Sequence, residues 1–149
     1  MFVGRYDHAL DDKGRTMMPK RFRDRLVALG DSLVWMTPAI DAPRHLDVMP
    51  DSIFSAFQSE VSAHKTDPLL ITFKRAYFGQ ALPVEVDSAG RVLIPAQLRQ
   101  RFQLGDRVSF VGVDERKFEL WDPQALDTEC DAVAVHAPAI IARLAELGL

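Results

Sequence analysis

The chain is poor in the residue types from which disulfide frameworks and zinc sites are built. Its 149 residues include one cysteine, Cys130, so an intrachain disulfide and a multi-cysteine zinc site are both excluded. The histidines lie in unrelated segments without the spacing of metal ligands, and they are His8, His45, His64 and His136. We therefore expect no metal site, and we interpret each histidine as a surface or packing residue.

Long apolar runs and the motifs of small-molecule chemistry are absent as well. No apolar run approaches the roughly 18 residues that a bilayer-spanning segment needs, and residues 1–7 lack the apolar core of a signal peptide. No nucleophile motif surrounds Cys130, and no phosphate-binding loop of the Gly-rich Lys-Ser/Thr kind is present. We expect a cytoplasmic protein that is not an enzyme and that takes no cofactor, no membrane partner and no small-molecule substrate.

What the chain does have is an ordinary globular composition with unevenly distributed charge. Hydrophobic residues make up 48% of it, which is typical of a soluble domain. The formal net charge is −3, yet six of the 18 Lys and Arg residues lie between Lys13 and Arg25, where Asp24 is the one acid. The distribution of charge is therefore more informative about partners than its sum.

The strongest pattern is an internal repeat. The stretch Asp11-Asp12-Lys13-Gly14-Arg15 returns as Asp87-Ser88-Ala89-Gly90-Arg91, and each copy is followed by a proline and a second arginine. The matched pairs, all 76 positions apart, are Gly14 and Gly90, Arg15 and Arg91, Pro19 and Pro95, and Arg23 and Arg99. Four matched positions without a gap indicate a duplication. We expect the same task to be performed twice, from two copies of one turn.

Apolar patterning predicts the same order of elements in both copies, namely strand, turn, strand, helix, strand and strand. The elements predicted for the first copy are strands 2–10 and 15–18, a helix from Pro19 to Gly30, and strands 33–36 and 46–49 separated by a Pro- and Asp-rich loop. Those predicted for the second are strands 82–86 and 92–94, a helix from Pro95 to Gly105, and strands 108–111 and 118–121.

The segments outside the repeat are predicted to be helical. Between the copies, one helix begins with Asp51 or Ser52 as its N-cap, and another begins at Asp67 and is stopped by Gly79. After the second copy, Asp122-Pro123 opens a helix. A last helix, from Pro138 to Leu147, is expected either to pack back on the domain or to face a neighbouring subunit.

The repeated turn has a structural and a functional interpretation. As a fold-making turn it needs glycine for the backbone, aspartate to accept N–H bonds and arginine to pair with that aspartate. This accounts well for Asp11, Gly14, Asp87 and Gly90, and it explains the aspartates more simply than a divalent cation does. It accounts poorly for Lys13 and Arg15, because basic residues beside the glycine of a projecting hairpin can enter a DNA groove and recognise guanine.

The helix that follows the first turn is strongly basic, and its role stays open at this point. Lys20, Arg21, Arg23 and Arg25 either hold phosphates, which positions a protein on DNA without specifying sequence, or form a solvated helix face. Arg23 and Arg99, being repeated, are alternatively structural ion-pair partners.

Two motifs carry a resemblance to a known family. The start reads Met1-Phe2-x-Gly4-x-Tyr6, then Leu10-Asp11-x-Lys13-Gly14-Arg15-x-x-x-Pro19-x-x-Phe22-Arg23. The second half reads Asp87-x-x-Gly90-Arg91-x-x-Ile94-Pro95-x-x-Leu98-Arg99, and later Phe118-Glu119-Leu120-Trp121-Asp122. Over about residues 1–125 the chain closely resembles MraZ proteins, whereas the C-terminal tail carries no part of the resemblance.

The resemblance implies a fold and a division of the chain. MraZ proteins look like a double member of the SpoVT/AbrB class, so the expected fold is α+β and mainly β, with duplicated swapped-hairpin β-barrel halves. The expected parts are a first repeat at 1–50, a helical connector at 51–79, a second repeat at 80–125 and a C-terminal helical tail at 126–149.

The resemblance also implies a function. It predicts a sequence-specific, DNA-binding transcriptional regulator that acts, as a ring-forming homo-oligomer associated with the nucleoid, on tandem promoter repeats of the division and cell-wall gene cluster. The residues implied to form the DNA-binding turns are Lys13, Gly14, Arg15, Gly90 and Arg91. Ala89 stands where the first copy has Lys13, so the second turn contributes less charge. The alternative on the same fold is a protein-interaction scaffold or antitoxin-like module.

Overall fold

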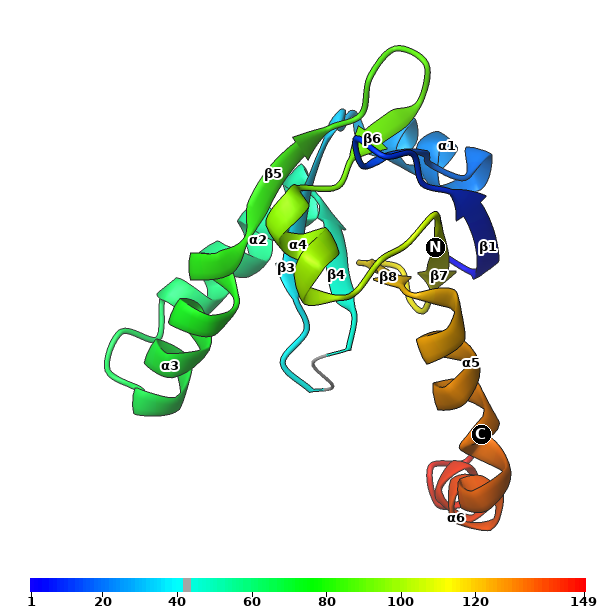
Figure 1. The fold of residues 1–149 in the computed structure, drawn as a ribbon. Helices are drawn as coiled ribbons and strands as arrows, with labels where there is room; N and C mark the ends of the chain where they lie inside the picture. Colours follow the sequence, from blue (N-terminus) through cyan, green and yellow to red (C-terminus); the bar gives the residue numbers. More distant parts are fainter. Residues whose placement is uncertain (42–43) are drawn as a thin grey trace.

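The computed structural model describes residues 1–41 and 44–149. Its strands form a six-stranded sheet in the order β1-β7-β8-β4-β3-β5 and a separate two-stranded ribbon of β2 and β6, and all pairings are antiparallel (Figure 1). The expected α+β class is therefore confirmed. The six-stranded sheet ends at β1 and β5, so across the described residues it is open and not a closed barrel.

The elements follow the predicted order. The first repeat contains β1 (Gly4–Ala9), β2 (Arg15–Met17), α1 (Lys20–Leu29), β3 (Leu33–Pro38) and β4 (Leu46–Pro50). The second contains β5 (Leu82–Glu85), β6 (Arg91–Leu93), α4 (Ala96–Arg101), β7 (Arg107–Gly112) and β8 (Phe118–Trp121). The other elements are α2 (Asp51–Ser62), α3 (Pro68–Ala76), the 3₁₀ turn η1 (Phe78–Gln80), α5 (Pro123–Asp131) and α6 (Val133–Glu146). Residues 42 and 43 of the predicted Pro- and Asp-rich loop lie outside the described residues.

The two repeats interlock through their strands. The first strand of each repeat pairs with a strand of the other, β1 with β7 and β5 with β3. The short second strands, β2 and β6, form a ladder with each other, and Thr16 of β2 also bridges to Leu10. A ladder between β4 and β8 joins the two closing hairpins. Because strands of each repeat pair with strands of the other, neither repeat forms the six-stranded sheet from its own strands alone.

The core lies where the repeats meet. Phe2, Phe22, Phe110 and Phe118 are fully buried and come from both ends of the chain. Phe22 on α1 lies 4.9 Å, between ring centroids, from Phe118 on β8. Aromatic rings of this size bury a large apolar area, and edge-to-face contacts among them add to that gain. The helical spacing of the apolar residues of α1 therefore serves to cover the shared sheet.

The helical connector has its own apolar cluster. Trp35 on β3 stacks on Phe54 of α2 at 4.8 Å, and Phe54 contacts Phe78 of η1. The ring of Phe73 on α3 stacks on Tyr77 at 5.0 Å. This cluster attaches α2 and α3 to one end of the sheet, where Figure 1 shows them projecting away from the ribbon of β2 and β6.

The predicted N-cap of one helix and the predicted start of another are wrong. Helix α2 begins at Asp51 and has no side-chain cap, because its N-cap residue is Pro50, which has no polar side chain. The side chains of Asp51 and Ser52 bond elsewhere, Asp51 accepting from the Trp35 indole and Ser52 donating to Asp31. Helix α6 begins at Val133, with Pro138 inside it. A proline there removes a single backbone N–H, and the helix continues through it. By contrast, the expected cap of α3 is confirmed, since Asp67 accepts from Leu69 and Leu70.

Two predicted helix stops are wrong as well. Helix α3 ends at Ala76, and Gly79 lies in η1. Helix α4 ends at Arg101, and it is Gln103, at φ 52°, and not Gly105 that takes the left-handed conformation beyond it. In the first repeat Gly30, at φ 76°, ends α1 as expected. The second helix is therefore the shorter of the two, and its stop falls on a residue that the glycine rule does not identify.

The tail extends away from the sheet. Leu126 of α5 is buried, and Arg5 of β1 pairs with Asp127 at 2.5 Å. Helix α6 has no buried residue and contacts α5 rather than the sheet (Figure 1). Of the two alternatives for this last helix, packing back on the domain is therefore wrong, and contact with a neighbouring subunit stays a prediction. Within the described residues, none of the helices is long and apolar enough to cross a membrane.

Candidate nucleic-acid interface

The first turn is built by the carboxylate of Asp11. Its Oδ1 accepts the backbone N–H of Lys13 at 3.0 Å and that of Arg15 at 2.8 Å. Gly14, at φ 89°, donates its backbone N–H to the Asp11 carbonyl. The hydrogen bond from the Arg15 backbone is the main cause that lowers the pKa of Asp11, and pairing with the Arg15 side chain adds to it. The aspartate therefore stays ionised and holds the turn closed.

The second turn has the same geometry. Asp87 Oδ1 accepts the backbone N–H of Ala89 at 2.9 Å and that of Arg91 at 2.8 Å, and Gly90 has φ 87°. The pKa of Asp87 is lowered, first by the Arg91 backbone N–H and then by the Arg91 side chain. The duplication read from the sequence is thus a duplication of hydrogen bonds.

The two turn arginines are each fixed at one nitrogen. Arg15 Nε donates to Asp11 Oδ2 at 2.8 Å, and Arg91 Nε donates to Asp87 Oδ2 at 2.9 Å. The side chains are 43% and 46% exposed. Within the described chain, neither guanidinium makes a hydrogen bond through its terminal amino groups. Each arginine therefore presents a pre-oriented pair of N–H donors to solvent.

Strand pairing brings the two arginines onto one face. In the ladder of β2 and β6, Arg15 lies opposite Leu93 and Met17 lies opposite Arg91. Both strands alternate exposed, buried, exposed, with Thr16 and Val92 pointing inward. Arg15 and Arg91 are diagonal neighbours in this ladder, a relation that places positions about 7–8 Å apart. The outer face of the ribbon, which we call the ribbon face, consists of Arg15, Met17, Arg91 and Leu93.

The second pair of repeated arginines supports the turns from the opposite repeat. Arg23 Nε donates to the Met18 carbonyl and Arg99 Nε to the Ile94 carbonyl, both at 3.0 Å. The Arg99 side chain covers Gly14, and the Arg23 side chain covers Gly90. These arginines bond to backbone carbonyls and are structural. The ion-pair role considered for them has no carboxylate partner among the described residues.

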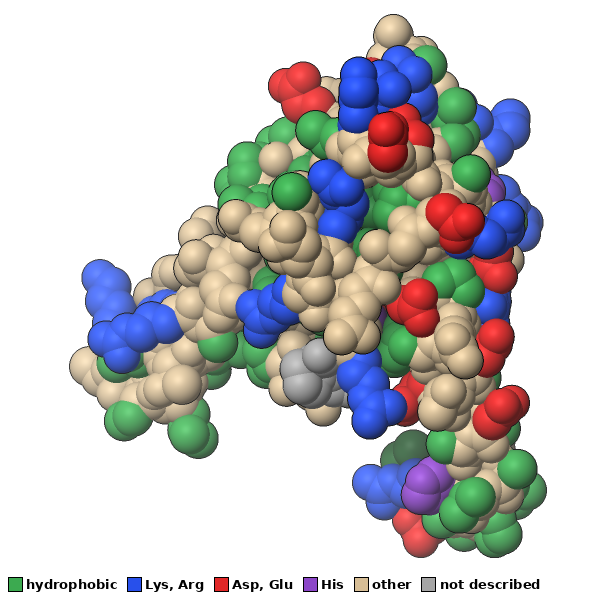
Figure 2. Space-filling model, in the orientation of Figure 1, with side chains coloured by type: hydrophobic (Ala, Val, Ile, Leu, Met, Phe, Trp, Pro, Cys, Tyr) green, Lys and Arg blue, Asp and Glu red, His purple; other side chains and the backbone are tan. Residues whose placement is uncertain are grey.

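The remaining basic residues differ in their solvent exposure and in their hydrogen-bond partners. Lys13 and Arg21 are exposed, and Lys20 forms an exposed pair with Asp24 at 2.7 Å. Arg25 is half-buried, and its Nε has no hydrogen-bond partner in the described chain. Figure 2 shows Lys and Arg side chains gathered at the end of the molecule where α1 and the connection between β5 and β6 lie. Basic side chains thus lie close to the ribbon face, interspersed with paired aspartates of the same turns and helix, although the chain as a whole is acidic.

Comparison with known proteins points to one family. A family model described as "MraZ protein, putative antitoxin-like" matches residues 77–129. A protein named transcriptional regulator MraZ in Thermomicrobium roseum is 36% identical over 148 residues, 99% of each chain. A relative with the same name in Roseiflexus castenholzii is 35% identical over 99% of each chain. Another, in Nitrosomonas europaea, is 34% identical over 91% of this chain and 90% of the relative.

The chain belongs to the MraZ family of transcriptional regulators. Because these relatives are named as regulators, the expectation that the chain is not an enzyme is confirmed. The likeness also extends further than the sequence motifs indicated, since the alignments reach across 99% of the chain and so include the C-terminal tail.

The structure brings the predicted site residues of this MraZ chain together at two adjoining turns. Gly14 and Gly90 are buried and shape the backbone, whereas Lys13, Arg15 and Arg91 are exposed. Sequence reasoning missed Met17 and Leu93, which lie on the ribbon face between the arginines. The alternation of Arg15-Thr16-Met17 and Arg91-Val92-Leu93 contained that signal, but only the pairing of β2 with β6 shows that the two triplets share a face.

Proposed function

We propose that this MraZ chain regulates transcription by binding double-stranded DNA with its ribbon face. The observation that carries the proposal is the pair of exposed arginines on one face of β2 and β6, each held at Nε by the aspartate of its own turn. A two-stranded antiparallel ribbon fits the major groove of B-DNA, and arginine bonds in pairs to the O6 and N7 of guanine. One such contact discriminates against other bases by about 1–3 kcal/mol.

The residues around the ribbon face have the character of phosphate contacts. Lys13 projects from the first turn and Arg21 from the adjacent helix, and both are exposed. Phosphate contacts fix the register of a protein on DNA without reading bases. Because Ala89 replaces the lysine in the second turn, the two ends of the ribbon face contribute unequal charge.

Binding of tandem sites by an oligomer extends the proposal. One ribbon face carries two base-reading arginines, and that alone supports modest affinity. A ring of several subunits on repeated promoter sites raises affinity through effective concentration without new contacts. In keeping with its resemblance to the family, we propose the promoter of the division and cell-wall gene cluster as the target and the nucleoid as the place of action.

The test is a binding selection from random DNA, followed by substitutions at the turns. Arg15→Ala and Arg91→Ala should each weaken binding of the selected sequence by about tenfold or more, since each removes a bidentate base contact. Arg143→Ala is the matched control, because Arg143 is an exposed arginine on α6 that pairs with Glu146. Mobility shifts measure affinity, and circular dichroism checks that each variant is folded.

Unchanged shifts for both turn variants would contradict the proposal. Salt dependence gives a second measurement, because log affinity falls with log salt by about 0.9 for each phosphate contact on duplex DNA. A selection that recovers no sequence, together with capture of an acidic protein through the same arginines, would favour the antitoxin-like alternative named in the description of the matching family model.

A further inference from the structure

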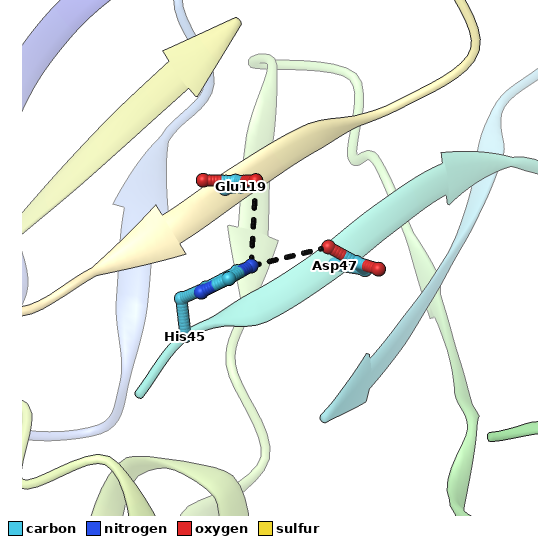
Figure 3. A group of neighbouring side chains, drawn as sticks. All are labelled: His45, Asp47 and Glu119. Carbon is cyan, nitrogen blue, oxygen red and sulfur yellow. Dashed lines mark ion pairs between the residues drawn. The ribbon is translucent and has the colours of Figure 1, made fainter. Parts of the chain in front are cut away.

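A buried cluster of three ligand-type side chains lies between β4 and β8, away from the ribbon face. His45 immediately precedes β4, Asp47 lies two residues on and so on the same face, and Asp47 pairs in register with Glu119 on β8 (Figure 3). His45 and Asp47 are each 3% exposed. No sequence pattern predicted this cluster, because Glu119 is distant in the chain and His45 has no other histidine near it.

The distances within the cluster are longer than those of ordinary hydrogen bonds. His45 Nε2 lies 3.4 Å from Asp47 Oδ1 and 3.3 Å from Glu119 Oε1. Within the described chain, neither ring nitrogen of His45 nor Asp47 Oδ1 has a hydrogen-bond partner. His45 Nε2 forms ion pairs with both carboxylates when the imidazole is protonated, but buried polar atoms without a hydrogen bond are rare and call for an explanation such as an ion or water.

The same distances equal those between ligands of a tetrahedral metal. Zinc binds histidine nitrogen at about 2.0–2.1 Å and carboxylate oxygen at about 2.0–2.2 Å, which in a tetrahedron separates neighbouring ligand atoms by about 3.3–3.5 Å. The three candidate ligand atoms all lie within 4.8 Å of one another. Asp47 also lines an open cavity of about 320 Å³ beside Tyr77 and Lys117, so the cluster lies close to solvent on that side.

Neighbouring side chains donate hydrogen bonds to the second oxygen of each carboxylate. Asp47 Oδ2 accepts from Tyr77 Oη and Lys117 Nζ, each at 2.8 Å. Glu119 Oε2 accepts from the Trp121 indole at 2.8 Å. The His45 ring stacks on Trp121 at 4.5 Å between centroids. Each carboxylate therefore keeps one oxygen directed at the imidazole, and the surrounding contacts fix the three groups as outer-shell partners fix metal ligands.

The cluster attracts positive charge. Burial lowers the pKa of His45, but the attraction of the Asp47 and Glu119 carboxylates outweighs it and raises the pKa to about 9. Burial raises the pKa of Asp47, but its interactions with His45 and Lys117 outweigh burial and lower that pKa overall. The carboxylates therefore hold a proton on the imidazole, and a metal cation has to displace that proton in order to bind.

We propose that His45, Asp47 and Glu119 form a binding site for a zinc-type divalent cation that joins β4 of the first repeat to β8 of the second. One imidazole nitrogen and two carboxylate oxygens are a donor set suited to Zn²⁺. The bound cation clamps the hairpins of the two repeats together and stabilises the fold by mass action. This role is independent of the proposed DNA contacts.

The experiment uses the full chain without an affinity tag, freed of metal by a chelator and titrated with ZnCl₂ by calorimetry at about pH 8, where zinc competes better with protons. We expect one zinc ion per chain and a melting temperature that rises with zinc. His45→Gln and Glu119→Gln should weaken binding by about tenfold or more and abolish the thermal shift. The matched control is His136→Gln on α6, which should bind as the unmodified chain does.

A measurement on the unmodified chain covers the case in which a cluster variant fails to fold. Zinc should shift the imidazole NMR resonances of His45 and leave those of His64 and His136 in place. No saturable binding, an unchanged affinity in folded His45→Gln, or shifts confined to the other histidines would overturn the proposal and leave a proton as the occupant.

Discussion

At the residue scale, the two turn glycines show how a backbone requirement and a crowded neighbour act together. Gly14 and Gly90 have φ near 90°, a conformation that side chains disfavour. A Cβ on Gly14 would fall on the Arg99 side chain and 2.8 Å from the Ile94 carbonyl oxygen, and one on Gly90 would lie 2.6 Å from Arg23 Cδ. Because each glycine lacks a Cβ, it leaves room for the arginine side chain of the opposite repeat.

Gly14→Ala is predicted to destabilise the fold by about 1–3 kcal/mol from backbone strain, with displacement of Arg99 adding to that loss. Gly90→Ala should behave in the same way through Arg23. Urea unfolding followed by circular dichroism measures both effects.

Gly105→Ala is the control for this prediction. Gly105 does not have a positive φ, and a Cβ added there would meet no other atom within 4 Å. The free energy of unfolding of this variant should stay the same or rise by up to about 1 kcal/mol. Equal losses in all three variants would show that the turns have no special requirement for glycine.

At the element scale, the ribbon of β2 and β6 is the unit of recognition. Each strand has three residues, too few to be stable alone, and each is held by the turn before it and by its partner from the other repeat. The turns lie at the predicted positions in the sequence, but the strands that follow them pair with each other and do not form two separate DNA-binding surfaces. Two turns share one surface, and Met17 and Leu93 lie between their arginines.

Met17→Asp and Leu93→Asp are predicted to weaken DNA binding by about tenfold or more, because a new anion on the ribbon face faces the phosphates of the groove. Both side chains are exposed, so the free energy of unfolding should change by less than about 1 kcal/mol. Mobility shifts and urea unfolding measure the two quantities.

Leu69→Asp provides the comparison, because Leu69 is more exposed than either residue and lies on α3, at the far end from the ribbon (Figure 1). If Leu69→Asp weakened binding as much as the ribbon variants, net charge rather than the ribbon face would be responsible.

At the scale of the whole molecule, two interlocked repeats form the body and the tail stands apart from it. The sheet alternates between the repeats at β1 with β7, β4 with β8 and β3 with β5. Helix α5 is attached through Leu126, whereas α6 exposes several large apolar side chains, and Figure 2 shows apolar side chains at the lower end of the molecule. The division of the chain at 1–50, 51–79, 80–125 and 126–149 stays a prediction.

Removal of residues 133–149 is predicted to change the free energy of unfolding by less than about 0.5 kcal/mol, because no residue of α6 is buried. In contrast, Leu126→Ala in α5 should cost about 2–5 kcal/mol through the cavity it leaves. Thermal and urea unfolding at several protein concentrations measure both. A large, concentration-dependent loss on truncation would show that α6 stabilises the protein through contacts between subunits.

The local structure of the chain follows from its sequence alone, because the forces that decide it act over a few residues. A glycine three residues after an aspartate specifies each turn, and proline with apolar spacing specifies the start of α1. The offset of 76 positions between matched residues reveals two copies of the strand–turn–strand–helix unit. The predicted cap of α2 failed because the helix begins one residue earlier than a cap at Asp51 allows, which places Pro50 at the N-cap, and the Asp51 carboxylate bonds to the distant Trp35 indole.

The relations between distant residues came only from the tertiary structure. It alone shows that Arg15 and Arg91 share one face, that Arg23 and Arg99 support the turns, and that His45 meets Glu119. Each of these depends on pairing between strands far apart in the chain, and register is set by burial of a common core rather than by neighbours in sequence.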